Sequence, residues 1–230
     1  LSIAAADMGT GCDTILAQMA AECLECSIDD IMVSGADTDT SPYDSGSYAS
    51  SSTYVTGKAV ERACEKLKGH IFNKAAEMME AADTLEFDGK KVRDAESGKE
   101  VSLVDIATAS MCNNNETFQV TETNSSPVSP PPFMVGMVEI ELDKETGSIE
   151  VVDYVAVVDC GTPVNPNLAR VQVEGGLGQG IGMALYEGVD YTPNGYVKQN
   201  SFMQYKVPAR VDVGKLRVEF ESSYEPTGPF

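Results

Sequence analysis

The sequence has little positive charge, and this scarcity excludes several classes of protein. Its 230 residues include 16 lysines and arginines against 36 aspartates and glutamates, so the formal net charge is -20. Nucleic-acid binding requires a basic surface, and anionic membranes attract basic segments, so we expect neither as a partner. No apolar run approaches the ~20 residues that would span a bilayer.

Histidine is nearly absent, which argues against several kinds of catalytic and metal site. His70 is the only one. It flanks the apolar stripe of an expected helix, so we interpret it as structural, and a Ser–His–Asp triad has little support. Cys23 and Cys26 are the only closely spaced pair of cysteines, and such a pair makes a poor zinc site. Scattered, unpaired cysteines indicate reduced thiols and a cytoplasmic protein.

Fingerprints of nucleotide binding are also missing. The chain has no GxxxxGK[ST] loop, which excludes a P-loop. Gly178-Gln179-Gly180 lies in a helix-like segment, without a preceding strand and without GxGxxG spacing, so a dinucleotide fold is not indicated. The cysteine spacing does not match an iron–sulfur pattern. Because the chain begins at Leu1 rather than at methionine, we expect a piece of a longer polypeptide.

The first half of the sequence predicts alternating helices and strands. Helical spacing of apolar residues predicts helices over 14–26 and 57–82, the first with Asp13 as its N-cap. Residues 29–35 predict a short buried strand. Turn signals around Gly89 and Gly98 predict strands within 84–103. Ser102 is then expected to cap a short helix that ends at Ser110, with Asp105 at its third position.

The second half predicts a hairpin followed by a glycine-rich helix. The proline-rich stretch 120–133 is expected to be irregular and extended. Residues 134–161 predict a β-hairpin that turns at 144–147. Glycines alternate with apolar residues over 171–186, and each costs roughly 1 kcal/mol against alanine in a helix. Such a helix is expected where its backbone must approach a partner helix or a large ligand.

Two turns lead into helices and could hold an anion. The segments 7–18 and 45–56 bring glycine or hydroxyl residues to a helix start, where backbone N–H groups bind oxyanions without lysine. Each turn alone is typical of an ordinary helix start, and Ser45–Tyr54 also fits a flexible linker. Both turns together with Gly178-Gln179-Gly180 favour a cradle for an anionic cofactor.

Four segments, in the same order along the chain, resemble one known family. They are Ala6–Leu24, Asp37–Val60, Ser125–Gly147 and Asp159–Gly188. The family is the molybdenum hydroxylases, which include xanthine dehydrogenase and aldehyde oxidase, and the resemblance is to their C-terminal molybdopterin-binding region. It implies an α+β fold with two α/β subdomains, at 1–120 and 121–230, truncated at both ends.

The resemblance also implies which residues contact the cofactor, and none of them ligates the metal. Two turns and a helix supply these residues. The residues expected to touch the pterin from the first turn and helix are Gly9, Thr10, Gly11 and Gln18. Those expected to wrap the pterin and its phosphate are Ser47, Tyr48, Ala49, Ser50, Ser51 and Thr53. Gln179, between Gly178 and Gly180, is expected beside an oxygen ligand of molybdenum and is the candidate catalytic residue.

The implied activity is hydroxylation of an N-heterocycle, such as xanthine or hypoxanthine in purine metabolism, with oxygen from water. The implied cofactors are molybdenum and molybdopterin, with or without a nucleotide, and iron–sulfur clusters and FAD on other domains or subunits. A catalytic glutamate is expected shortly beyond Phe230. Expected partners are the N-terminal part of the molybdopterin subunit, the iron–sulfur and FAD subunits, and a second copy of the assembled enzyme.

Three alternatives stay open at this point. Within the family, an aldehyde oxidoreductase or a carbon monoxide dehydrogenase-like subunit fits the same segments. As an isolated piece, the chain could instead be a non-catalytic interaction module.

Overall fold

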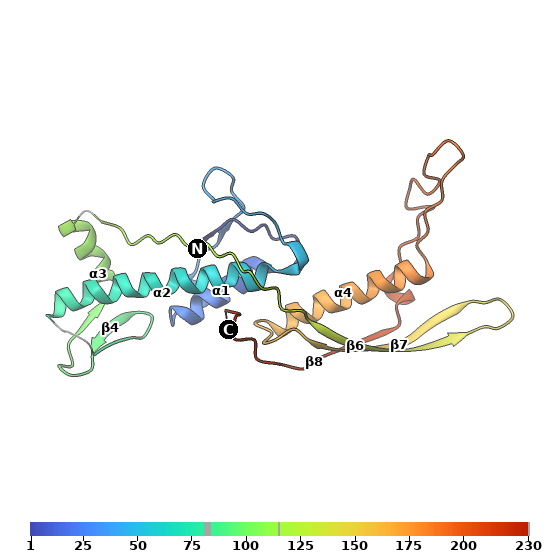
Figure 1. Cartoon of the computed structure of the whole chain (residues 1–230). Coiled ribbons are helices and arrows are strands. Elements are labelled where there is room, and N and C mark those ends of the chain that lie inside the picture. Colours follow the sequence, from blue (N-terminus) through green and yellow to red (C-terminus); the bar gives the residue numbers. More distant parts are fainter. Residues whose placement is uncertain (81–83, 115, 230) are drawn as a thin grey trace. The chain divides into compact units, whose positions relative to one another are not determined.

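The chain forms two compact units. The computed structural model describes residues 1–80, 84–114 and 116–229. Unit 1 comprises Leu1–Ser129 and Pro226–Phe230, and unit 2 comprises Pro130–Glu225 (Figure 1). The chain passes into unit 2 at Pro130 and its end belongs to unit 1 again, and the family subdomains expected at 1–120 and 121–230 stay a prediction. The mixed α+β architecture is confirmed.

Unit 1 is built around one long helix. Its elements, in chain order, are β1 (Ser2–Ile3), α1 (Cys12–Cys23), η1 (Ile28–Asp30), β2 (Ser34–Gly35), η2 (Tyr48–Ser50), α2 (Ser52–Met79), β3 (Leu85–Phe87), β4 (Lys91–Asp94), β5 (Glu100–Ser102), α3 (Leu103–Ala109) and η3 (Ser110–Asn114). Strands β3, β4 and β5 form an antiparallel sheet, and β1 pairs with β2 in parallel. Figure 1 shows α1 running alongside α2.

Helix α2 contributes to two apolar contacts in unit 1. Its C-terminal half packs through Ile71, Ala75 and Met79 against Val92 of β4 and Ile106 of α3. Its N-terminal half lies close to α1, since a methyl group on Gly57 would stand 2.7 Å from the Met19 sulfur. Glycine at this position therefore permits the close approach of the two helices.

The expected helices of unit 1 are confirmed, with different ends. Helix α1 begins at Cys12, and Gly11 in a left-handed conformation precedes it, so the expectation that Asp13 is the N-cap was wrong. Helix α2 begins at Ser52, earlier than predicted, and the predicted end at Ala82 lies outside the described residues. Ser102 caps α3 as expected, with its hydroxyl accepting from the Asp105 N–H at 3.1 Å.

The predicted buried strand over 29–35 is wrong. Residues 28–30 form the 3-10 turn η1, and only Ser34 and Gly35 belong to a strand. The Ser27 hydroxyl accepts a hydrogen bond from the Asp29 N–H, a local bond that favours a turn over a strand. Met32 is 86% exposed, so this apolar stretch does not enter a core.

Unit 2 is a three-stranded sheet with one helix on it. Its elements are β6 (Phe133–Leu142), β7 (Ile149–Asp159), α4 (Pro166–Leu185), η4 (Arg210–Asp212) and β8 (Lys215–Phe220). The order in the sheet is β6-β7-β8, with β6 and β7 antiparallel and β7 and β8 parallel. The predicted hairpin is therefore confirmed. Leu177 and Ile181 of α4 pack on β7 residues such as Val151 and Ala156.

Helix α4 begins earlier than the sequence periodicity predicted. Pro166 occupies its first turn, and the Asn165 side chain accepts from the Leu168 N–H at 3.1 Å. Proline at the first position and asparagine at the N-cap are favoured helix starts, because neither leaves an orphan donor to satisfy. No helix among the described residues has both the length and the apolar character to cross a membrane.

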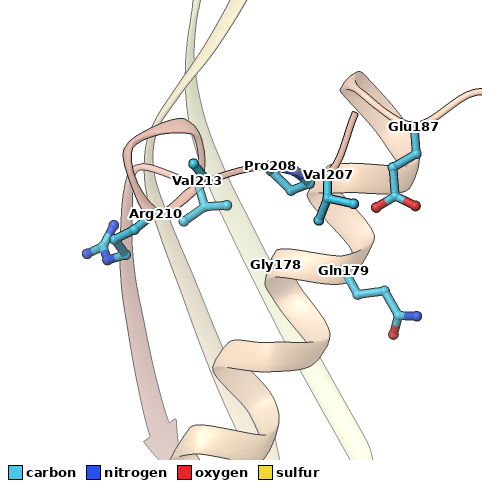
Figure 2. A pocket seen from close by; sticks show the side chains of 8 residues that line it. Gly178, Gln179, Glu187, Val207, Pro208, Arg210 and Val213 are labelled. Atoms are coloured by element: carbon cyan, nitrogen blue, oxygen red, sulfur yellow. The ribbon is translucent and has the colours of Figure 1, made fainter. Parts of the chain in front are cut away.

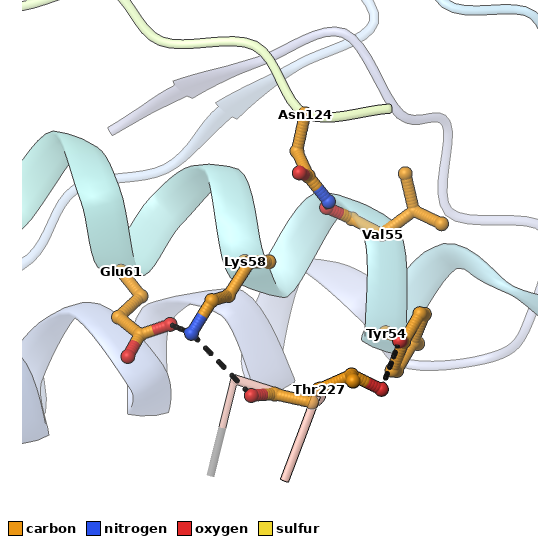
Figure 3. A network of polar contacts seen from close by, with 7 residues as sticks. Tyr54, Val55, Lys58, Glu61, Asn124 and Thr227 are labelled. Carbon is orange, nitrogen blue, oxygen red and sulfur yellow. Dashed lines mark hydrogen bonds and ion pairs between the residues drawn. The ribbon is translucent and has the colours of Figure 1, made fainter. Parts of the chain in front are cut away.

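The end of the chain is held against the start of α2 (Figure 3). The Tyr54 hydroxyl donates to Thr227 Oγ1, and Lys58 Nζ donates to the Gly228 carbonyl at 3.5 Å. A second distant segment, the proline-rich stretch, also contacts this part of α2, because Asn124 Nδ2 donates to the Val55 carbonyl at 3.1 Å. The first turns of α2 are thus fixed by segments that are distant in sequence.

We predict that Gly89→Ala destabilises unit 1 more than Gly98→Ala does. Both glycines have a positive φ, of 81° and 70°, so alanine is strained at either one, at about 1–2 kcal/mol. Only at Gly89 would the added methyl meet backbone, since the Glu25 carbonyl oxygen would lie 2.0 Å away. Urea unfolding of both variants measures the difference, and equal losses of stability would contradict the close approach.

Candidate functional site

The hydroxyl-rich turn before α2 is exposed and joined by its own side chains. The Ser47 and Ser52 hydroxyls are hydrogen-bonded to each other across the turn. Asp44 Oδ1 accepts from the Gly46 N–H at 2.6 Å. Ser50 N–H donates to the Ser47 carbonyl at 3.3 Å, which forms the short turn η2. These bonds give the segment a defined shape, so the alternative of a flexible linker is not favoured.

Two neighbouring residues in this turn have an unusual backbone conformation. Ala49 has φ 52° and Ser50 has φ 57°, which places two non-glycine residues in the left-handed region. Such conformations cost on the order of 1–3 kcal/mol each. Both residues are exposed, so core packing does not explain the strain. Strain without a packing reason is typical of ligand-binding turns.

The first turn of α2 lacks a side-chain cap. Ser51 is the N-cap, but its side chain accepts no hydrogen bond from the helix. The first N–H groups of any helix have no partner within the helix, and together they carry a partial positive charge. Thr53, which is exposed, lies in this first turn. The turn therefore presents amides and hydroxyls that can bind an oxyanion in a strongly acidic chain.

The turn before α1 already holds an anion, which is the carboxylate of Asp7. Its Oδ1 accepts from the Gly9 N–H at 2.9 Å and from the Gly11 N–H at 3.1 Å. These bonds, with that of Gly9 the largest cause, lower the pKa of Asp7. The Asp-x-Gly spacing could have indicated this bond in the sequence. Gly9 and Gly11 can therefore turn their amides to a ligand only where Asp7 releases them.

Cys12 follows this turn and is buried beside two carboxylates. Oxygen atoms of Asp7 and Asp13 and the Cys12 sulfur all lie within 4.8 Å of one another. Burial, followed by the charges of Asp7 and Asp13, raises the pKa of the thiol, and the thiol donates to Asp13 Oδ1 at 3.7 Å. A protonated thiol is a poor metal ligand, so this cluster is better explained as a packed helix start.

The remaining predicted residues of unit 1 lie close to these two turns in the chain. Thr10 is half-buried within the first turn, and Gln18 is half-buried farther along α1. Tyr48 is exposed at the start of η2. Each turn thus contains its own predicted residues, while Gln18 lies in the body of α1.

The glycines of α4 leave open space along much of the helix surface, between side chains such as that of Gln179. A methyl group added at Gly175, Gly176, Gly178 or Gly180 would meet no described atom within 4 Å. Leu177 and Ile181, which face the sheet, are buried, whereas Gln179 and Gly180 are exposed. The close packing that the glycines predicted is therefore not supplied by unit 2. The space beside these glycines of α4 is open to a ligand or to another chain segment.

Gln179 lines a cavity of about 430 Å³ between α4 and the loop before β8. Figure 2 shows its side chain extending from α4, with Glu187 and Arg210 on opposite sides of Val207 and Pro208. Arg210 Nη1 donates to the Gly214 carbonyl at 2.6 Å. The residues that line the cavity therefore include an amide, a carboxylate and a guanidinium residue beside the apolar Val207, Pro208 and Val213.

Sequence reasoning missed the loop side of this cavity. The Tyr205 hydroxyl donates a hydrogen bond to the Glu187 carboxylate, and this bond raises the pKa of Tyr205. Glu187 in turn lies against α4, since a methyl group on Gly182 would stand 2.3 Å from its Oε1. These residues are separated in sequence and form no local motif, so only Gly182, as a small residue on the helix, could have indicated the contact.

The predicted site residues therefore fall in two separate groups. Ten of them belong to unit 1 and surround the starts of α1 and α2, and Gly178, Gln179 and Gly180 belong to unit 2. Within each group, the structure supports exposed amides, hydroxyls or glycine backbone, which are suited to a large anionic ligand.

Comparison with known proteins identifies what this arrangement is similar to. The profile of a family described as "Molybdopterin cofactor-binding domain" matches residues 1–214. The protein named probable hypoxanthine oxidase XdhD, from Escherichia coli, is 33% identical over 233 residues, which cover 98% of this chain and 24% of that protein. The chain thus spans about a quarter of this relative's length.

Two solved structures share the fold. One is of a reconstituted CO dehydrogenase from Oligotropha carboxidovorans, with a TM-score of 0.87 and 30% identity, covering 98% of this chain and 29% of the other. Another is of quinoline 2-oxidoreductase from Pseudomonas putida 86, with a TM-score of 0.83 and 26% identity, covering 99% and 30%. Both the sheet with its glycine-rich helix and the turns before α1 and α2 therefore belong to a shared architecture.

We predict that Asp7→Ala destabilises the start of α1 at neutral pH and has little effect in acid. The folded-state pKa of Asp7 is lowered, so its stabilisation is complete above about pH 4 and is lost as the pH falls through the lowered pKa. Thermal unfolding of wild type and variant from neutral to acid pH measures this. Asp7→Asn keeps an acceptor oxygen and is expected to lose less. A difference that persists undiminished in acid would contradict the role of the carboxylate.

Proposed function

Because the chain belongs to the molybdopterin cofactor-binding domain family of the molybdenum hydroxylases, we propose that it forms part of the cofactor site of a large oxidoreductase subunit. The proposed reaction is hydroxylation of an N-heterocycle such as xanthine or hypoxanthine, with oxygen from water. Relatives named hypoxanthine oxidase and quinoline 2-oxidoreductase support this substrate class. The proposed location is the cytoplasm.

The start of α2 carries this proposal. It offers uncapped helix amides, a strained and exposed Ala49–Ser50 pair and a cluster of hydroxyls, and these features fit the phosphate of a pterin cofactor. Ser47, Tyr48, Ser51 and Thr53 complete the proposed contacts on this side. The chain has a net charge of -20 and residues 45–54 contain no lysine or arginine, so amides and hydroxyls are expected to bind the phosphate.

The turn before α1 is proposed to hold the pterin, and helix α4 is proposed to hold the metal end of the cofactor. Gly9, Thr10, Gly11 and Gln18 are proposed to contact the pterin, with Asp7 as an internal competitor for the amides. On α4, the glycines are proposed to allow close approach of the cofactor, and the exposed Gln179 is proposed to donate a hydrogen bond to it. When bound, the cofactor supplies the Lewis acid and two-electron acceptor that hydroxylation with water requires.

The end of the chain is proposed to bring the catalytic base to this site. The family resemblance places a glutamate shortly after Phe230. Tyr54 and Lys58 hold Thr227 and Gly228 beside the first turns of α2, directly after the hydroxyl-rich turn. A glutamate that follows this segment would therefore enter from the side of α2.

The proposed partners are the rest of the molybdopterin subunit, the iron–sulfur and FAD subunits or domains, and a second copy of the enzyme. Transfer of two electrons away from the site requires redox groups that lie elsewhere. A carbon monoxide dehydrogenase-like subunit is the second candidate, because the CO dehydrogenase structure has a TM-score of 0.87 to this chain. Assays of the full subunit complex with xanthine, quinoline, aldehydes and carbon monoxide separate these candidates.

Metal analysis of the full-length large subunit, expressed with molybdate, tests the proposal directly. We expect molybdenum in stoichiometric amount, and its absence from correctly folded subunit would contradict cofactor binding. The 230-residue chain alone is expected to show no xanthine-dependent dye reduction. Turnover by the chain alone would show that the remaining subunit is not needed.

We predict opposite effects of Gly180→Ala in two settings. In the chain alone, alanine should stabilise α4 by about 1 kcal/mol, because no described atom would meet the added methyl. In the full-length subunit, the same methyl should lower the molybdenum content, because it occupies the space proposed for the cofactor. Gly69→Ala in α2 is the matched control, with similarly open space, and should leave the molybdenum content unchanged.

We also predict that Gln179→Ala lowers turnover while folding is retained. The side chain is exposed on α4 and packs in neither apolar core of unit 2, so its removal should change stability by less than ~0.5 kcal/mol. Steady-state kinetics and thermal unfolding of the full-length enzyme measure the two effects. Unchanged turnover would remove Gln179 from the site.

A further inference from the structure

Strand β6 is exposed along its whole length and is unusually apolar for an edge strand. All ten of its residues are exposed, and Phe133, Val135 and Met137 are 68%, 70% and 70% exposed. In the sheet order β6-β7-β8, one edge of β6 pairs with β7, and its other edge pairs with no strand of the described residues. Soluble proteins rarely leave such a long apolar edge open.

The opposite edge of the same sheet is protected in the usual way. Strand β8 alternates exposed charged residues with half-buried apolar ones, and its exposed positions are Lys215, Arg217 and Glu219. Charged side chains of this kind discourage further strand pairing. From Phe133 to Val138, β6 contains no charged residue at all. The two edges therefore differ in the property that decides whether another strand can add to them.

Helix α4 does not extend its cover to β6, where the Tyr154 side chain lies over Gly136 but leaves the neighbouring residues exposed. Helix α4 packs on Ala156 and Val158 of β7, and on Leu216 and Val218 of β8. Val138 of β6 shares a face with Tyr154 by register, yet it is 52% exposed. The cover that α4 provides therefore ends at β7, and a strand added to β6 would extend the sheet without displacing any element of unit 2.

The C-terminal half of β6 carries two glutamates that would favour a basic residue on an added strand. Glu139 pairs in register with Asp153, and Glu141 pairs with Glu150. Arg217 forms an ion pair with Asp153 at 2.7 Å, but no described residue forms an ion pair with Glu139 or Glu141. Adjacent like charges on a sheet are unfavourable unless a cation lies beside them. A strand beyond β6 would thus be apolar near Val135 and basic near Glu139.

These features argue against a second copy of this chain as the partner of the free β6 edge. A second copy would bring a further net charge of -20 and the same two unpaired glutamates. By contrast, the curated relative and the solved structures are three to four times longer than the chain, which spans 24–30% of their length. A segment of that additional polypeptide belongs to the same molecule as β6. It would therefore be present once for each β6 and would pair with it without a bimolecular association step.

We propose that the free edge of β6 pairs with an extended strand from the part of the large subunit outside these 230 residues. The added strand carries apolar side chains beside Val135 and Met137 and a basic side chain beside Glu139. Main-chain hydrogen bonds supply the pairing, and the alternating side chains set its register. This inference rests on the proposed function only in requiring a longer subunit, not in requiring bound cofactor.

Hydrogen exchange in the full-length subunit and in the chain alone tests this pairing. Amides of 133–138 that are not bonded to β7 should exchange roughly 100-fold more slowly in the full-length subunit, since they then exchange only by local opening. In that subunit, Val135→Lys should restore fast exchange over this segment. Val211→Lys is the matched control, because Val211 is an equally apolar residue of unit 2 that is 88% exposed and lies outside β6.

Each result decides the question. Equal exchange in the two proteins would overturn the proposal, as would protection in the chain alone that increases with concentration, which would identify a second copy as the occupant. Both lysine variants are also unfolded thermally as isolated chains, where an unchanged melting temperature shows that unit 2 is intact. Molybdenum content is measured on the same full-length samples. Protected β6 without molybdenum would contradict the proposed function alone, and bound molybdenum with unprotected β6 would contradict this inference alone.

Discussion

The need of backbone N–H groups for hydrogen-bond partners governs both units of this chain. In unit 1, the turn before α1 satisfies its amides with the Asp7 carboxylate, whereas the turn before α2 leaves the helix start without a side-chain cap. In unit 2, β7 satisfies only one edge of β6. Because unpaired amides are costly once water is removed, the start of α2 and the free edge of β6 are poised to accept a partner from outside.

The same need explains why the two turns, so similar in sequence, are not equivalent. Both carry small residues into a helix, and both belong to segments that resemble one family. Each has an aspartate two residues before a glycine, but Asp7 also accepts from Gly11, which directly precedes α1, whereas Asp44 accepts from Gly46, well before the start of α2. In the second, Ala49 and Ser50 remain in a strained conformation that no buried contact explains. The second turn therefore stands out as the stronger anion site, a distinction that composition alone does not make.

Much of the secondary structure could be predicted from the sequence, because it depends on local signals. Periodic apolar residues indicated α1 and α2, and the Ser102–Asp105 spacing indicated the start of α3. The prediction of a strand over 29–35 failed because Ser27 forms a local turn and because Met32 has no core to enter. Apolar character alone does not distinguish an exposed connection from a buried strand.

The candidate site was less predictable, because part of it depends on contacts between distant residues. The glycines of α4 and the hydroxyl-rich turn are visible in the sequence. The loop that brings Glu187 and Arg210 to the Gln179 cavity is not, since nothing local in the sequence relates these residues. The return of the final residues to unit 1 could not be predicted from the sequence either, because it depends on their contacts with α2.

The return of the chain from unit 2 to unit 1 has a consequence for the order of folding. The bond between Tyr54 and Thr227 spans 173 residues, and the whole of unit 2 lies within that span. During synthesis, the beginning of α2 therefore leaves the ribosome long before the segment that fixes it. Unit 1 must wait, incomplete, while an entire second unit is made, so a cofactor that requires the finished start of α2 can be inserted only late.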